Sequence, residues 1–408
     1  MAQRRAAAAR RGAVLITAAV VPLMLTACGT SADSSSSQSH SVVLQRPAAL
    51  TNDTTVYDKI FRECEESTGI TIKTQDIPQD GYLPKVLSQL SSKTLPDVLM
   101  LDNGDVQQIA SSGALSPLTD FGVKLDGFAE GAVQAGTFEG KQYAMQPVAN
   151  TVALFYNKGV LAAAGVTPPT TWDELKAAAA KLKSSGTYGV AFSAPASEEG
   201  TYQFLPFMWS NGGDEKNIAS DETAAALQLW TDLVASGSAP QSVLNWTQAD
   251  VNDQFIAGKV AMMVNGPWQI ASLDKAGVDY GIAAIPAPAA GKTIQSPLGG
   301  ETWTVPNTGN KSRQQDAAKV VECIGSDAHQ LANAVGRNLV PTKLAIKEEF
   351  VKQAPSMKGF ADQVPGLRSR TGELGTEWPK TSKQISGAIQ TALTGGAAPL
   401  DALKQAKG

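Results

Sequence analysis

Histidine is nearly absent from this chain of 408 residues, which contains only His40 and His329. A metal site built on a pair of histidines needs both in one place, but His40 lies in a Ser-rich stretch that has little to pack against. A Ser–His–Asp triad needs a histidine fixed beside a nucleophile, and neither histidine is well placed for that role. We therefore expect neither a metal site nor a hydrolase triad.

Other catalytic signatures are also missing. The sequence has no glycine-rich phosphate loop with its lysine and no dinucleotide fingerprint, and its cysteines lack the close spacing of zinc ligands. We expect no cofactor. A carboxylate pair for glycoside hydrolysis stays possible, because two acids suffice and the sequence does not give their separation. The candidates are Glu198, Glu199 and Glu301, each of which is otherwise a solvated charge or a hydrogen-bond partner for a ligand.

Long apolar runs are absent after Cys28, where nothing approaches the roughly 20 residues of a membrane span. The formal charge of the whole chain is −4, and residues 1–27 contain four arginines and no acid, so the remainder carries −8. A net-acidic surface argues against nucleic acid as a partner.

The first 27 residues have the features of an export signal. Four arginines precede an apolar stretch at 13–25, which is too short to span a membrane but suits a signal-peptide core. The stretch ends in Leu25-Thr26-Ala27-Cys28, which resembles a bacterial lipobox. We expect residues 1–27 to be a lipoprotein signal peptide and Cys28 to become acylated, for example with palmitate. The alternative is an ordinary signal peptide with an incidental cysteine.

Residues 28–40 are rich in serine and almost free of apolar side chains. Such a segment cannot bury a core, so we expect a flexible tether. Cleavage before Cys28 leaves 381 residues, which points to two domains. The protein would then be held to the extracellular face of the cell membrane by lipid alone.

Short β-like runs alternate with amphipathic helices in the first half of the remaining chain. Strands are expected at 41–44, 70–75 and 97–101, with one helix through Val56, Ile60 and Cys64 and another through residues 83–90. This order predicts an α/β domain with a largely parallel sheet. Ligands bind beyond the carboxyl ends of the strands in such sheets, so loops 46–53 and 102–105 are candidate contacts.

A second α/β unit begins after Asn150. The expected strands are 152–156, 188–192, 259–264, 280–285 and one that starts at Thr302. Helices are expected from Trp172, with Thr171 as N-cap, through Ala317 to Ile324, and finally over 383–393. No long linker separates the two halves, which favours lobes that are interleaved in sequence.

Seven tryptophans are the positive signal for a ligand, because flat aromatic faces stack on pyranose rings. Trp172 and Trp230 lie on periodic helices and are expected in the core. The other candidates lie near Gly, Pro or Asn in apparent loops, where they can face a cleft: Trp209, Trp246, Trp268 and Trp378.

Many short segments occur in an order typical of one family. They are Thr68-Gly69-Ile70, Leu95-Pro96-Asp97-Val98, Gly113-Ala114-Leu115, Gly140-Lys141-Gln142-Tyr143-Ala144, Leu154-Phe155-Tyr156-Asn157-Lys158, Thr171-Trp172-Asp173-Glu174, Gly258-Lys259-Val260-Ala261-Met262-Met263, Gly266-Pro267-Trp268, Gly299-Gly300 and Pro341-Thr342. In these segments the chain resembles the extracellular solute-binding proteins of carbohydrate ABC transporters, the family that includes maltose-binding protein.

The resemblance implies a two-lobe α/β fold of the periplasmic-binding-protein type. The chain would cross the hinge three times, near 150–152, 300–303 and 370–371, and the ligand would lie in the cleft between the lobes. The implied amino-terminal lobe contains 41–150 and 303–370, and the carboxyl-terminal lobe contains 151–302 and 371–408.

The resemblance also implies ligand contacts. It puts Asp102 and Asn103 in a sugar-binding loop, Asn150 at the first crossing, and Gly300 and Glu301 at the second. Trp268 matches a stacking tryptophan. The remaining predicted contacts are Glu199, Tyr202, Trp246, Arg337 and Trp378, whereas the segment 46–53 is hard to align.

The same resemblance also bears on the two remaining cysteines, Cys64 and Cys323. Both would belong to the amino-terminal lobe, where related folds place their helices near each other, so a disulfide is implied. Two inert buried thiols are the alternative.

The implied function is capture of a sugar or oligosaccharide, followed by delivery to the permease of an ABC importer whose ATPase supplies the energy. Ligand-driven closure of the lobes would signal occupancy. We expect a monomer that catalyses nothing. The alternatives are the same scaffold binding a non-sugar such as a glycerol phosphodiester, and a lipid-anchored glycosidase.

Overall fold

A computed structural model describes residues 40–48, 54–184 and 186–408. The predicted signal peptide, Cys28 and the tether up to Ser39 lie outside the described residues. His40, which we counted with the tether, already contacts the folded chain, because its Nδ1 lies 2.7 Å from Asp316 Oδ2. Within the described ranges, no helix combines the length and the hydrophobicity that a membrane span requires.

The first sheet, here called the amino-terminal sheet, has the order β2-β1-β3-β13-β4, with β7 also beside β13. Its strands are β1 (Ser41–Pro47), β2 (Thr71–Ile77), β3 (Val98–Asp102), β4 (Leu115–Ser116), β7 (Ala144–Met145) and β13 (Glu301–Pro306). β1 pairs in parallel with β2 and β3, as predicted, whereas β13 is antiparallel to β3. After β3 the chain adds β4 and β7 to this sheet, and it returns much later at β13, which pairs with β3, β4 and β7.

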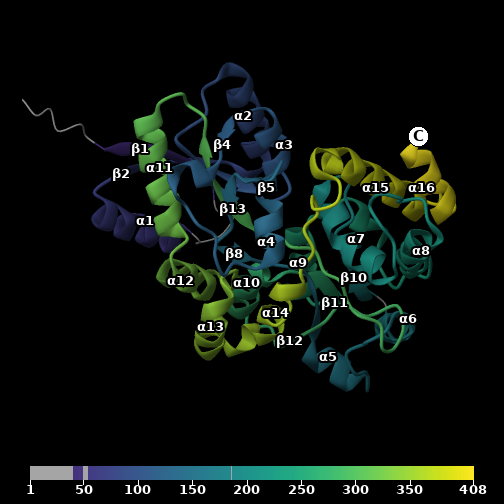
Figure 1. Cartoon of the computed structure of the whole chain (residues 1–408). Coiled ribbons are helices and arrows are strands. Elements are labelled where there is room, and N and C mark those ends of the chain that lie inside the picture. The colour runs from purple at the N-terminus through teal and green to yellow at the C-terminus, as the bar shows by residue number, and fades with distance from the viewer. Residues whose placement is uncertain (1–39, 49–53, 185) are drawn as a thin grey trace, which may run out of the picture. The chain divides into compact units, whose positions relative to one another are not determined.

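Helix α1 (Thr54–Thr68) shows why the fourfold spacing indicated a helix. Ile60 and Cys64 are both buried, and Tyr57 and Phe61 on the same face place their rings 5.4 and 5.9 Å from the Trp303 ring of β13. Helix α11 (Lys311–Ile324) packs beside α1 and β1, although it lies far away in sequence (Figure 1). A disulfide joins Cys64 of α1 to Cys323 of α11, which is the pairing implied by the resemblance.

The second sheet has the order β10-β11-β9-β12. Its strands are β9 (Ala153–Asn157), β10 (Tyr188–Ala191), β11 (Val260–Asn265) and β12 (Tyr280–Ala283). β10 and β11 pair in parallel, whereas β9 pairs in antiparallel with both β11 and β12. The core beside this sheet contains Trp230, whose ring stacks on Phe192 at 4.0 Å.

Helices surround this second sheet. They are α5 (Lys158–Ala163), α6 (Trp172–Leu182), α7 (Glu198–Ser210), α8 (Asp221–Ala235), α9 (Gln248–Ile256), α10 (Ile270–Lys275), α15 (Trp378–Leu393) and α16 (Pro399–Lys407). Thr171 caps α6 in a capping box with Glu174, as its position predicted. Helix α16 was not expected. The carboxyl-terminal helices α15 and α16, yellow in Figure 1, pack against α7 and α8.

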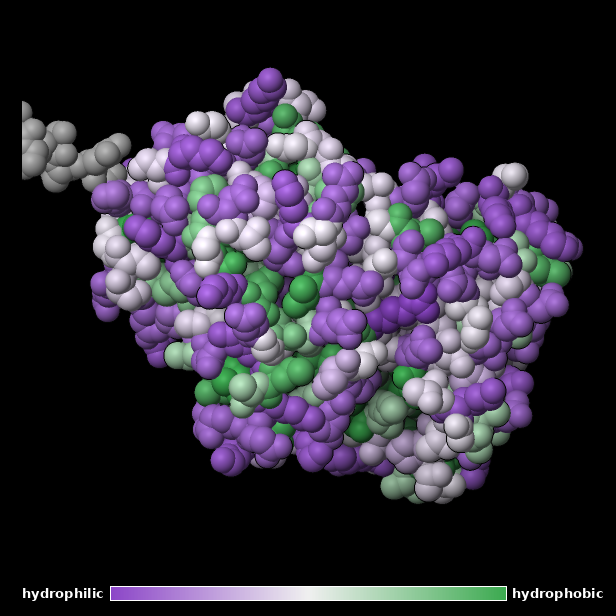
Figure 2. All heavy atoms as spheres, viewed as in Figure 1, coloured by the Kyte–Doolittle hydropathy of each residue, from purple (hydrophilic) through white to green (hydrophobic). Residues whose placement is uncertain are grey.

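The described chain has further α-helices and strands. They are α2 (Gln79–Ser92), α3 (Val106–Ser111), α4 (Glu130–Ala135), α12 (Asp327–Arg337), α13 (Lys347–Gln353), α14 (Lys358–Ala361), β5 (Thr137–Phe138), β6 (Lys141–Gln142), β8 (Val148–Ala149) and β14 (Val340–Pro341). Hydrophilic residues cover most of the face seen in Figure 2.

Three segments pass between the two sheets, and they bond to one another. Asn150 N donates to Gly299 O at 3.0 Å, and Gly299 N donates to Asn150 O at 2.9 Å. Leu298 N donates to Arg368 O at 2.8 Å, and Arg368 N donates to Ser296 O at 3.0 Å. The segment around Gly299 therefore lies between the other two.

Gly300 lies where these segments are packed so tightly that only glycine fits. Its φ is +130°, and a Cβ at this position would lie only 2.7 Å from Val148 O, so there is no room for a side chain. We expect Gly300→Ala to lower the free energy of unfolding by about 1–3 kcal/mol. The matched control is Gly387→Ala in α15, where a Cβ would meet no atom within 4 Å and should stabilise the helix by up to about 1 kcal/mol. Urea unfolding of both variants would check this, and equal effects would contradict the packing described.

Candidate ligand-binding site

The site is built on one edge of the amino-terminal sheet. β3 ends at Asp102, and β13 begins with Glu301 directly opposite in the antiparallel ladder. Asn103 and Gly300 follow and precede these residues, and Asn103 N donates to Gly300 O at 3.2 Å. Four predicted contacts are therefore brought together because two strands meet at their ends.

Arg370 lies at the centre of this edge, with only 3% of its side chain exposed. Its Nη2 bonds to Asp102 Oδ1 at 2.5 Å and also to the side-chain oxygen of Asn103. Its Nη1 bonds to Glu198 Oε1 at 2.5 Å. Because Asp102 ends β3 and Glu198 begins α7, one buried guanidinium connects the two lobes. Both carboxylates stay accessible, with 52% and 43% of their side chains exposed.

Glu198 is held by further donors. Trp378 Nε1 donates to its Oε1 at 3.2 Å, and the Ser382 hydroxyl donates to its Oε2. Both donors come from α15, which packs beside α7. The carboxylate is thus fixed from two sides before any ligand arrives.

Negative charge is in excess around Arg370. Burial, together with the charges of Asp102 and Glu198 and against the opposing effect of Arg370, raises the pKa of Asp105 to about 7. Burial alone would lower the pKa of Arg370, but the two carboxylates outweigh it and hold that pKa above the usual range. Three carboxyl groups therefore share one guanidinium.

Asn150 and Tyr202 contact each other inside the hinge. The Tyr202 hydroxyl lies 3.3 Å from Asn150 Oδ1, and a Cβ on Gly299 would lie 2.3 Å from that hydroxyl oxygen. The side chain of Asn103 also bonds within the protein, since its Nδ2 donates to Leu298 O at 3.1 Å. In this structure these predicted contacts pack the hinge, and Tyr202 additionally lies under the Arg370 guanidinium at 5.1 Å.

Glu301 and Arg337 pair with each other, and the two side chains are 13% and 12% exposed. The Tyr57 hydroxyl donates to Glu301 Oε1 at 2.7 Å. Burial would raise the pKa of Glu301, but Arg337 outweighs burial and lowers it. A glycosidase acid needs a raised pKa, so this environment does not suit Glu301 to that role.

Glu199 lies at the carboxyl ends of β10 and β11. It accepts hydrogen bonds from the Ser193 hydroxyl at 3.3 Å and from the Gln248 backbone N–H. Burial raises its pKa despite these donors. Gln269 Nε2 reaches Gln248 O at 3.3 Å, which ties the turn that contains Trp268 to the same place.

Trp246 and Trp268 are partly exposed, as a stacking role requires. The Trp268 ring lies over Gly266, where a Cβ would come within 2.0 Å of it. The Gly-Pro-Trp sequence thus gives the indole its position by removing a side chain beneath it.

Trp209 and Trp378 were expected in loops, and this expectation is wrong. Trp209 lies inside α7 and Trp378 begins α15, and they are 2% and 1% exposed. Trp209 Nε1 donates to Glu215 at 2.7 Å. The neighbouring Gly and Pro residues misled us because the helices begin or end beside them. Trp230 is in the core as expected. Trp172 was also expected in the core, but it is only half-buried on α6 and packs against the core from outside. Arg46 is likewise not in a loop, since it belongs to β1 and bonds to Asp76 at 2.7 Å.

Sequence reasoning missed Arg370 and Ser382 as site residues. It included Asp105 only as part of the candidate loop 102–105, and considered Glu198 as a hydrolase carboxylate, a solvated charge or a hydrogen-bond partner for a ligand. Arg370 follows Arg368 in a short polar segment, and this charge pattern at a crossing was the available signal. The partners of Arg370 lie 268 and 172 residues away, so no local pattern indicates them.

Comparison with known families decides the assignment. A model described as bacterial extracellular solute-binding protein matches residues 59–359. The chain belongs to this family. A diacetylchitobiose binding protein of Streptomyces coelicolor is 26% identical, over 86% of this chain and 84% of its own. A maltooligosaccharide ABC transporter solute-binding lipoprotein of Streptococcus pneumoniae is 28% identical, over 70% and 69%.

A solved structure extends the comparison to the fold. The GacH receptor of Streptomyces glaucescens, described unliganded and with acarbose, superposes with a TM-score of 0.76 at 28% identity. The match covers 90% of this chain and 96% of the receptor. The predicted two-lobe α/β fold and the predicted family are therefore confirmed.

The excess charge at this site predicts a pH effect. The pKa of Asp105 is about 7 in the folded protein and 3.8 ordinarily, so the folded state binds a proton more tightly and loses stability as pH rises from about 4 to 7. Relative to the parent protein, the free energy of unfolding of Asp105→Asn should rise by at least about 1 kcal/mol between pH 4.5 and pH 8. Urea unfolding at both pH values measures it, with exposed Asp253→Asn as control. Parallel profiles for Asp105→Asn and the parent would refute the assignment.

Proposed function

We propose that this solute-binding protein captures a sugar or oligosaccharide between its lobes and delivers it to an ABC importer. We further propose that it is a monomer anchored through acylated Cys28 at the extracellular face of the membrane. The family and the named ligands of its relatives support sugar binding, and the lipoprotein relative supports the anchor. The lobe boundaries implied by the resemblance are part of this proposal.

The observation that carries the proposal is the junction at Arg370. Accessible carboxylates from both lobes, Asp102 and Glu198, converge on one cation. Carboxylates bind sugar hydroxyls, and the partly exposed Trp268 offers an apolar face for a pyranose ring. A ligand that contacts both lobes stabilises the closed arrangement in proportion to its extra contacts there.

The same junction argues against a glycerol phosphodiester. Asp102 and Glu198 outnumber Arg370, and Asp105 adds further negative charge as it ionises at about pH 7, so a phosphate would meet repulsion. Of the three candidate hydrolase carboxylates, Glu301 is held ionised beside Arg337 and does not suit the role of the acid. The protein would bind and release its ligand unchanged.

A thermal-shift screen tests the function directly. Neutral mono- and oligosaccharides, including maltooligosaccharides and chitooligosaccharides, should include one that raises the melting temperature saturably. Chromatography of the same mixtures should show no cleavage products. Absence of any shift across the panel would count heavily against sugar binding, and product release would favour a glycosidase.

Trp268 is the residue on which we expect the sugar ring to stack. Trp268→Ala should weaken affinity for the sugar found in the screen at least tenfold, about 1.4 kcal/mol, without unfolding the protein. The matched control is Trp172→Ala, which removes another half-buried tryptophan, on α6. Calorimetry measures both variants, and unchanged affinity in Trp268→Ala would remove this residue from the site.

A further inference from the structure

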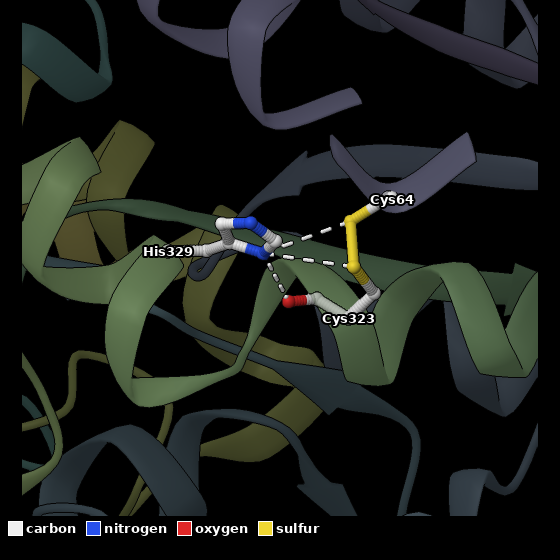
Figure 3. Close-up of side chains that lie close together, drawn as sticks. All are labelled: Cys64, Cys323 and His329. Carbon is white, nitrogen blue, oxygen red and sulfur yellow. Dashed lines mark hydrogen bonds between the residues drawn. A yellow bond between two sulfur atoms is a disulfide. The ribbon is translucent and has the colours of Figure 1, made fainter. Parts of the chain in front are cut away.

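His329 of α12 lies against the disulfide between α1 and α11 (Figure 3). Its Nδ1 is 3.7 Å from Cys64 Sγ and 3.6 Å from Cys323 Sγ. Its other ring nitrogen, Nε2, is 3.2 Å from Glu63 Oε2. These four residues take no part in the proposed ligand site.

These distances fit a metal. Zinc binds thiolate sulfur at about 2.3 Å and imidazole nitrogen at about 2.0–2.1 Å, usually with tetrahedral angles, which separates neighbouring sulfur and nitrogen ligands by about 3.6 Å. Both sulfur-to-Nδ1 distances already have this value. The two sulfurs would have to move apart, and Nδ1 would have to give up its hydrogen bond to Cys323 O. We propose that Cys64, Cys323 and His329 form a zinc-binding site when the disulfide is reduced.

Glu63 supplies the support that a zinc-bound histidine needs. Metal-binding imidazoles commonly donate their second N–H to a carboxylate, which fixes the ring and its tautomer. In the oxidised protein Nδ1 lies 2.7 Å from Cys323 O and so donates to it. Metal binding requires Nδ1 without a proton, and the ring proton is then on Nε2, where it faces Glu63. Cys323 O keeps a partner, because Ser326 N donates to it at 3.1 Å.

The redox step requires an external dithiol. Cys64 Sγ is buried and Cys323 is half-buried, so the reductant thiolate attacks Cys323 Sγ. The Cys64–Cys323 bond breaks, Cys64 leaves as thiolate, and a mixed disulfide forms on Cys323. The second thiol of the reductant then displaces Cys323 and closes a cyclic disulfide. Two electrons reach the protein, and Zn²⁺ displaces the two cysteine thiol protons. Water fills the fourth metal position.

The consequence is a cross-link that survives a change of redox state. The disulfide joins α1 to α11, and the metal would join the same helices and add α12. An amino-terminal lobe that has not been oxidised would then still be held together wherever Zn²⁺ is available.

Cobalt titration tests the site, because Co²⁺ replaces Zn²⁺ and reports its ligands by absorption. The full chain with Cys28→Ser has only the two relevant thiols. After reduction with dithiothreitol and anaerobic desalting, one equivalent of Co²⁺ should produce thiolate charge-transfer bands and intense tetrahedral d–d bands. Zn²⁺ should abolish them, and the oxidised protein should show none. Reduced protein without these bands would overturn the proposal.

Variants separate a metal site from two incidental thiols. Glu63→Gln should weaken Co²⁺ binding by about 10- to 100-fold, whereas Glu66→Gln, an exposed position on the same helix, should leave it unchanged. His329→Ala should lose the tetrahedral spectrum, with circular dichroism to verify folding. Parent-like affinity in Glu63→Gln and a parent-like spectrum in His329→Ala would both contradict the proposed ligand set.

Discussion

A single buried cation constrains how the two lobes meet. The guanidinium of Arg370 has lost its water, so it requires anionic partners at short range, and it finds them on both lobes in Asp102 and Glu198. Removing either partner would leave a buried charge poorly compensated. This requirement accounts for the convergence of the ends of β3 and α7 on one guanidinium, whereas the raised pKa of nearby Asp105 comes first from its burial and then from Asp102.

Arg368 fixes the same crossing segment from the opposite side. Its Nη2 bonds at 2.7 Å to Glu215, whose side chain is fully buried, and its guanidinium lies 4.7 Å from the Trp209 ring. Residues two apart in an extended segment usually share a face, but Arg368 and Arg370 have different partners because the chain turns after Ser369. Arg368 has these partners beside the second sheet alone, whereas Arg370 has partners on both sides. Movement of the lobes would therefore leave the Arg368 contacts intact and strain those of Arg370.

The sequence was sufficient to predict the elements in which the spacing of apolar residues indicates a buried face. The helix through Ile60 and Cys64, the buried strand β3 and the capped helix α6 were all predicted, since each depends on neighbours within one element. It was insufficient where a contact spans the chain. Glu198 and Glu301 looked alike in sequence, yet one remains accessible beside Arg370 and the other is paired with Arg337. Likewise, a glycine or proline near Trp209 or Trp378 does not reveal whether a helix lies on that side.

The charge balance at Arg370 bears on how binding and closure are related. Asp102 and Glu198 already compensate the guanidinium, so a ligand hydroxyl gains from them only through oxygens or lone pairs that Arg370 leaves free. A neutral sugar can donate to those positions without displacing the cation, and both lobes then hold the ligand and Arg370 together. An anionic ligand would have to replace one carboxylate as partner of Arg370 and would leave that carboxylate facing the others. If the ligand binds as proposed, the junction would therefore select for hydroxyl donors by electrostatics, and the ring shape would be recognised elsewhere, on the indole of Trp268.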